Sequence, residues 1–153
     1  MPEEETLRRA HEDEQEGKSP STQAGEFVRE EIHHVREGKH GARNTKQAIA
    51  IGLSKARRAG VELPAPDASK TSASTRKKAK RDSTRSGRRG KPSPKRSRAT
   101  KKALQREGDS AATSRALSRQ ARQSASARGK KNRVNAAKKA ARTRASLERS
   151  RPE

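Results

Sequence analysis

Large apolar side chains are scarce in this sequence, and most of them lie in its first half. Residues 1–67 contain eleven Ile, Leu, Val, Met and Phe residues, whereas residues 68–153 contain four. Burial of apolar surface is the main contribution that offsets the conformational entropy lost on folding, so this supply allows only one small core. We therefore expect a chain that is mostly disordered, with a small all-α unit in its first half.

Charge changes sign along the chain. Residues 1–40 carry 11 acidic and six basic side chains, whereas residues 68–153 carry 29 basic and five acidic ones. The sequence predicts three parts: an acidic, disordered N-terminus at residues 1–22, a helical hairpin domain at 23–66, and a low-complexity segment rich in Ser, Ala, Lys and Arg at 67–153, the basic tail. We expect only marginal short helices in the basic tail, because closely spaced like charges destabilise a helix.

An αα-hairpin is expected at about residues 24–60. In its first helix, Val28, Ile32 and Val35 recur at helical spacing and form one apolar stripe. The glycine-containing stretch 38–41 interrupts this pattern and predicts a turn. The core of the hairpin is expected to consist of Phe27, Val28, Ile32, Val35, Ile49 and Leu53.

The second helix of the hairpin has signals at both ends. Asn44 followed by Gln47 is a capping-box pattern, and Gly60 is a typical residue just beyond a helix C-terminus. Ile51 points away from the face that carries Ile49, because residues two positions apart lie about 200° apart around a helix. Ile51 is therefore either a simple exposed residue or a contact in a homodimer.

The basic tail predicts a protein that binds nucleic acid through its phosphates, because clustered Lys and Arg are the electrostatic footprint of such a binder. Proteins that hold RNA or single strands usually stack bases on aromatic rings, and Phe27 is the only aromatic residue here. Duplex DNA is therefore favoured over RNA, with little reading of base sequence. The side chains expected on phosphates are Arg76, Lys77, Lys78, Lys80, Arg81, Arg88, Arg89, Lys91, Lys95, Arg96, Arg98, Lys101, Lys102, Arg128, Lys130, Lys131, Lys138, Lys139, Arg142 and Arg144.

Two short stretches of the basic tail resemble the tails of linker histones. Residues 93–96 read Ser-Pro-Lys-Arg, similar to the turns with which those proteins enter the minor groove of A·T-rich DNA. Residues 136–141 read Ala-Ala-Lys-Lys-Ala-Ala, which is also typical of such tails. The resemblance is one of composition, and it implies histone-like binding without base readout.

Signatures of catalysis are missing from the sequence, so we expect no enzyme, no cofactor and no small-molecule substrate. There is no cysteine, no phosphate-binding Gly-rich loop ending in Lys-Ser/Thr and no His-Glu-x-x-His. His33, His34 and His40 lie near three glutamates, which raises the possibility of a metal site. Adjacent histidines on a helix point about 100° apart, however, so polar residues at a helix end are the preferred interpretation, without a metal.

Residues 45–60, which read TKQAIAIGLSKARRAG, resemble the signature of a family of small basic bacterial proteins. The preceding residues 30–39 are similar to the helix which that family places before the signature. The family is catalogued as a domain of unknown function, or loosely as DNA-binding proteins. The resemblance covers residues 24–66 and implies a bacterial, intracellular protein, with no catalytic residue or ligand to transfer.

The interpretation that we favour is a cytoplasmic, nucleoid-associated, histone-like DNA-binding protein, with the hairpin used for dimerisation or docking. No apolar run is long enough to span a membrane. One alternative is an adaptor whose hairpin binds a protein while the tail holds nucleic acid, and another is an accessory protein of RNA or the ribosome. A helix-turn-helix reader would instead use Lys46, Gln47, Lys55 and Arg58.

Overall fold

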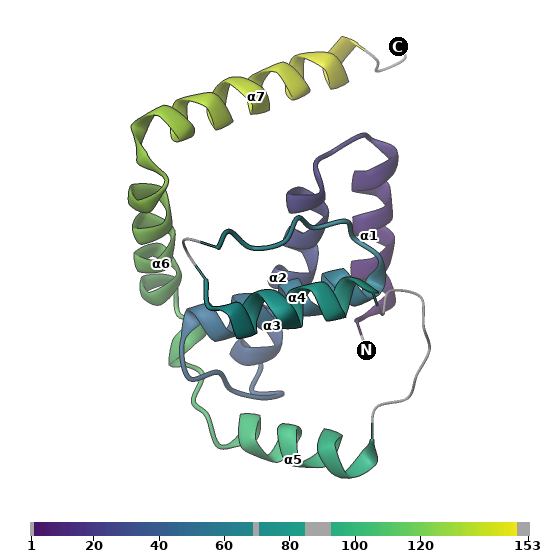
Figure 1. Ribbon diagram of the computed structural model, residues 1–153, viewed down its shortest axis with the longest axis vertical. Helices are drawn as coiled ribbons and strands as arrows, with labels where there is room; N and C mark the ends of the chain where they lie inside the picture. Colours follow the sequence, from purple (N-terminus) through teal and green to yellow (C-terminus); the bar gives the residue numbers. More distant parts are fainter. Residues whose placement is uncertain (1, 69–70, 85–92, 150–153) are drawn as a thin grey trace. The chain divides into compact units, whose positions relative to one another are not determined.

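A computed structural model describes residues 2–68, 71–84 and 93–149, and it divides the chain into two compact units, residues 1–113 and 114–153. The described residues form seven α-helices and one short 3-10 helix, with no β-strand among them (Figure 1). The elements are α1 (Glu4–Gln15), α2 (Pro20–Arg36), α3 (Thr45–Ala59), α4 (Ala73–Thr84), α5 (Pro94–Gln105), η1 (Ser110–Ala112), α6 (Ser114–Ala127) and α7 (Gly129–Arg149).

The expectation of a mostly disordered chain is wrong. The acidic N-terminus contains the 12-residue helix α1, and the described part of the basic tail forms helices of 12 to 21 residues instead of marginal short ones. Composition predicted a small core, but an α-helix satisfies its backbone hydrogen bonds within its own segment. Ala, Arg and Lys, which are abundant in the tail, also rank among the best helix formers.

The core of the N-terminal unit lies where α1, α2 and α3 meet. Helix α1 runs antiparallel to α2, and α2 packs along α3 (Figure 1). Phe27 is fully buried at the centre of this arrangement. It belongs to a buried cluster with Ala10, Ala24 and Ala56, against which Leu53, Val61 and Leu63 pack.

The two helices expected for the hairpin are present as α2 and α3. At the start of α3, the Asn44 side chain accepts a hydrogen bond from the Gln47 N–H at 2.9 Å, and the Gln47 side chain accepts one from the Arg43 N–H at 3.0 Å. At its end, Gly60 takes the left-handed conformation with φ of 111°. Both local signals therefore specified the helix ends.

The buried face of α3 differs from the prediction. Its buried residues include Thr45, Ala48, Gly52 and Ala56, whereas Ile49 and Leu53 are only partly buried. On α2, the expected residues Phe27, Ile32 and Val35 are buried, and Val28 is partly buried. Small side chains form the seam because they allow the two backbones to approach: a Cβ at position 52 would lie 2.7 Å from the Val28 Cα.

Replacing Gly52 with alanine is expected to lower the free energy of unfolding by about 1–3 kcal/mol, because the new methyl group collides with the α2 backbone. Gly25→Ala on α2 is the matched control, since a Cβ there meets no atom within 4 Å. That change should raise stability by about 0.5–1 kcal/mol through helix propensity. Urea unfolding followed by far-UV circular dichroism measures both, and a stabilising Gly52→Ala would contradict the close packing.

The end of α5 and the residues after it pack back against the turn between α2 and α3. The Gly41 N–H donates to the Leu104 carbonyl at 2.9 Å, and the Ala42 N–H donates to the Gly108 carbonyl at 3.1 Å. The Thr45 hydroxyl donates to the Ala111 carbonyl at 2.7 Å in a buried hydrogen bond. Part of the basic tail is thus built into the N-terminal unit.

Gly41→Ala is expected to detach residues 104–112 from the turn, because a Cβ at position 41 would lie 1.8 Å from the Glu107 carbonyl oxygen. Hydrogen exchange at the amides of Gly41 and Ala42 should then become faster, since both amides lose their acceptors. Gly108→Ala, where a Cβ meets nothing within 4 Å, serves as the control and should leave exchange unchanged. Equal exchange in the two variants would show that the contact is not formed.

The remaining helices differ in how much they bury. Helix α4 packs on α3 through the buried Ala79, and the Ser54 hydroxyl of α3 donates to the Asp82 carboxylate of α4. Helices α6 and α7 form the second unit, in which no residue whose burial is described is buried. None of the described helices has the length and apolar character needed to cross a membrane.

Candidate functional site

The predicted phosphate-contacting residues of α4 lie mainly on its outer side. Ala79 faces α3, Lys77 and Arg81 lie on the opposite side of the helix, and both of them and Lys80 are exposed. Lys78 is also exposed, whereas Arg76 is partly buried. Packing against α3 therefore fixes which side of α4 presents its positive charges.

Helix α5 exposes all five of its predicted cations, which are Lys95, Arg96, Arg98, Lys101 and Lys102. Ser93 is its N-cap residue and Pro94 its first residue. The Ser-Pro-Lys-Arg stretch is therefore the start of a helix, where proline is well tolerated, and the turn expected from the histone resemblance is wrong. The predicted cations Arg88, Arg89 and Lys91 lie outside the described residues.

Helix α6 carries a set of cations that the sequence analysis missed. Arg115, Arg119 and Arg122 are exposed and follow one another at spacings of four and three residues. On a helix this spacing places them within about 60° of one another, so they form one arginine face. They were missed because they are not contiguous in sequence, although the spacing itself is a helical signal.

Helix α7 presents a longer stripe of exposed lysines and arginines. Lys131, Lys138, Arg142 and Arg149 are exposed and lie within about 40° of one another around the helix. The stripe extends over the 19 residues from Lys131 to Arg149, a rise of about 27 Å along the helix. The other predicted cations, Lys130, Lys139 and Arg144 on α7 and Arg128 before it, are exposed on other sides.

The cations of these helices lack acidic partners. In the described part of the chain, ion pairs join groups between Glu3 and Lys55, and none involves a lysine or arginine of the basic tail. Within residues 114–149 there are 12 Lys and Arg against the single acid Glu148. Among the described residues of the second unit, the positive charges of α6 and α7 therefore have almost no acidic compensation.

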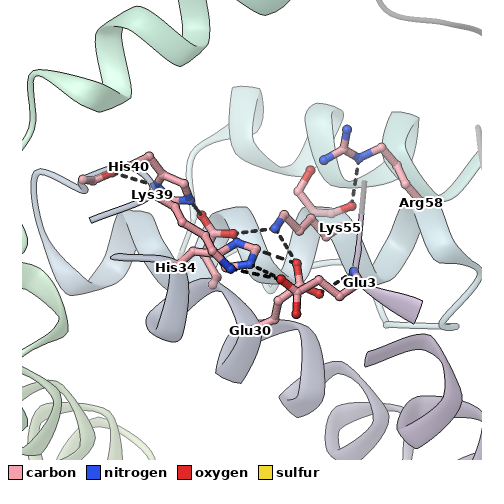
Figure 2. Close-up of polar contacts among 10 residues, drawn as sticks. Glu3, Glu30, His34, Lys39, His40, Lys55 and Arg58 are labelled. Atoms are coloured by element: carbon pink, nitrogen blue, oxygen red, sulfur yellow. Dashed lines mark hydrogen bonds and ion pairs between the residues drawn. The ribbon is translucent and has the colours of Figure 1, made fainter. Parts of the chain in front are cut away.

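A second candidate site is a polar cluster buried between α2 and α3 (Figure 2). The Lys55 ammonium lies 2.8 Å from a carboxylate oxygen of Glu30 and 2.8 Å from one of Glu31. The side chains of Glu30 and Glu31 are 2% and 0% exposed, so both carboxylates depend on this one lysine for most of their compensation. Glu30 also accepts a hydrogen bond from the Glu3 N–H at 3.0 Å.

The protonation states in this cluster follow from its contacts. Burial alone would raise the pKa of Glu30, but the contacts with Lys55, the Glu3 N–H and Thr6 outweigh it and hold the pKa below its usual value. Burial likewise acts to lower the pKa of Lys55, and the two glutamates reverse this and raise it. Lys55 and Glu30 are therefore charged partners that stabilise each other.

The cluster also bears on the helix-turn-helix alternative. Of the four side chains that such a reader would use, Lys55 is held by the two glutamates, Gln47 caps α3, and the Arg58 guanidinium donates to the Ser54 carbonyl at 3.1 Å. Lys46 is exposed. Three of the four side chains thus make contacts within the protein.

Lys55→Met is expected to lower the free energy of unfolding by about 3–5 kcal/mol, because it leaves two buried carboxylates without their main counter-charge. Lys46→Met on the same helix removes an exposed lysine and should change stability by about 0.5 kcal/mol or less. Thermal and urea unfolding of both variants test this difference. If the free energy of unfolding falls by the same amount in both variants, the ion pairs of Lys55 make no specific contribution to stability.

The comparisons with known proteins concern the hairpin. Residues 17–67 match a family model described as a family of unknown function (DUF6496). The match contains α2, α3 and the turn between them, and the description assigns neither DNA binding nor a motif to the family. No curated protein and no solved structure matches the chain.

Proposed function

We propose that this chain is a non-enzymatic protein that binds duplex DNA through its phosphates, largely without regard to base sequence. The observation that supports the proposal most strongly is the uncompensated arginine face of α6, formed by Arg115, Arg119 and Arg122, together with the stripe on α7. Guanidinium groups form charge-assisted, often bidentate hydrogen bonds with phosphate oxygens. A row of them on one side of a helix is suited to a row of phosphates.

The energetic basis of the binding is the release of counterions from the DNA. Each phosphate that a lysine or arginine neutralises sets free part of the condensed counterion layer, so affinity falls steeply with salt. If about eight cations contact phosphates, log K should fall against log salt with a slope of about −7. A charge that serves solubility alone would need a net value of only about 2–8, whereas this chain carries +22.

Duplex DNA is preferred to RNA and single strands because the chain offers bases almost nothing to stack on. Phe27 is its single aromatic residue and is buried in the core. Binding through phosphates alone gives histone-like, sequence-independent coverage of DNA. A nucleoid location within a bacterial cell is part of the same proposal.

Replacing Arg115, Arg119 and Arg122 together with glutamine is expected to weaken binding to an unrelated DNA duplex and to reduce the salt slope by about 2.7. The triple lysine variant should keep the slope, because it keeps the charge. The measurement is fluorescence anisotropy of full-length protein on a labelled duplex across a salt series.

A matched variant controls for net charge. Replacing Arg8, Arg29 and Arg43 with glutamine removes the same three charges from exposed positions of the N-terminal unit, and it should leave the slope nearly unchanged. If the salt slope falls by the same amount in both triple variants, DNA binding depends on the net charge of the protein and not on the face of α6. If the salt slope falls in neither variant, the proposal is wrong for this face of α6.

A further inference from the structure

The turn between α2 and α3 brings together three possible metal ligands. His40, in that turn, folds back toward Glu31 and His34 of α2 (Figure 2 shows His34 and His40). One ligand atom from each of the three residues lies within 4.8 Å of the others. The adjacent residues His33 and His34 are poorly placed to bind one ion together, whereas the structure pairs His34 with His40 and leaves His33 exposed.

Glu31 is the first reason to regard this cluster as a site. Its side chain is 0% exposed, and its Oε1 atom accepts no hydrogen bond among the described residues. Its compensation is ionic: the Lys55 ammonium lies 2.8 Å from one oxygen and His40 Nε2 lies 3.1 Å from the other. A buried carboxylate oxygen without a directed hydrogen bond is costly unless a cation is bound to it.

The environment of His40 also indicates that a cation could bind in this cluster. Its Nδ1 lies 3.1 Å from the Gly41 carbonyl oxygen, to which only an N–H can donate. In the neutral ring, Nε2 then carries a lone pair, and this atom lies 3.1 Å from a Glu31 carboxylate oxygen without a directed hydrogen bond between the two. Two acceptor atoms this close repel each other unless the ring is protonated or a metal cation lies near both.

The second histidine is also held in place. His34 Nε2 lies 2.8 Å from a carboxylate oxygen of Glu3, and the rings of His34 and His40 meet edge to face with centroids 6.0 Å apart. Carboxylates and backbone carbonyls that orient histidine rings in this way are typical of the surroundings of metal sites. The side chains of His34 and His40 are 13% and 16% exposed, so the site is open to an ion from solvent.

We propose that Glu31, His34 and His40 bind a Zn²⁺-type transition-metal ion. Two imidazoles and one carboxylate are a known zinc ligand set, and imidazole favours zinc over Mg²⁺ or Ca²⁺. In a tetrahedral site with bonds of about 2.0–2.1 Å, neighbouring ligand atoms lie about 3.4 Å apart. The contact of 3.1 Å between Glu31 and His40 is close to that value, and the His34 ligand atom, which lies within 4.8 Å of the other two, would move closer when the ion binds.

The ion would tie the turn to α2. The backbone of Gly41 and Ala42, next to His40, holds residues 104 and 108 by hydrogen bonds, so the same turn anchors the segment that follows α5. Metal binding would therefore stabilise the hairpin and the attachment of that segment together. This role is structural, and it is independent of whether the basic helices bind DNA.

Isothermal titration of the full-length, metal-free chain with Zn²⁺ tests the site, with Co²⁺ absorption as a second readout of tetrahedral coordination. One equivalent should bind, and His34→Gln and His40→Gln should each weaken binding by about tenfold or more. His33→Gln is the matched control on the same helix and should leave binding unchanged. Circular dichroism establishes that each variant keeps its helices.

The outcomes separate a built site from surface binding. If His33→Gln weakens binding as much as His40→Gln, or if the wild type binds no Zn²⁺, the inference is overturned. Should a variant lose its helices, the thermal midpoint of the wild type and of His33→Gln with and without Zn²⁺ decides instead. If Zn²⁺ raises the thermal midpoint of both proteins, the site is supported. If Zn²⁺ does not raise the midpoint of the wild type, the inference is overturned.

Discussion

The close approach of α2 to α3 is the constraint on which the rest of the N-terminal unit depends. Gly52 permits it, because no larger side chain fits against the backbone of Val28. With the helices this near, Lys55 of α3 reaches both Glu30 and Glu31 of α2. The turn that joins the helices is held close to both, so it can present His40 to α2 and its backbone to the segment after α5. A core made largely of alanines is sufficient because polar contacts add to it.

Charge has two different roles in this chain. Between α2 and α3, acidic and basic side chains are paired, and the contact between Glu30 and Lys55 outweighs the effect of burial, so that it raises the pKa of Lys55 and lowers that of Glu30. Such pairs favour one arrangement of the helices, because removing either partner leaves a buried charge. On α6 and α7, positive charges are exposed and have no acidic neighbour apart from Glu148. Most of these exposed charges are the groups that we propose contact DNA phosphates.

Local signals gave correct helix ends but an incorrect core face. Asn44, Gln47 and Gly60 act through contacts within a few residues, and the helix that they delimit is present. The core face of α3 was predicted from the large residues Ile49 and Leu53, and the buried seam instead uses Thr45, Ala48, Gly52 and Ala56. Apolar size is a guide to burial only when the helices stay far enough apart to accommodate it. Disorder in the tail was predicted from its lack of a core, whereas its described residues form helices rich in Ala, Arg and Lys, which have high helix propensity.

The sequence by itself determined the segregation of charge and the position of the hairpin, and it supplied most of the cations that we propose for phosphate contacts. These properties depend on composition and on contacts between near neighbours in the chain. Tertiary structure decided which groups separated in sequence come together. Glu31, His34 and His40 converge because a turn reverses the chain, and residues 104–112 return to that turn because Gly41 leaves room for them. Contacts of this kind depend on how helices pack in space, and no local pattern in the sequence encodes that packing.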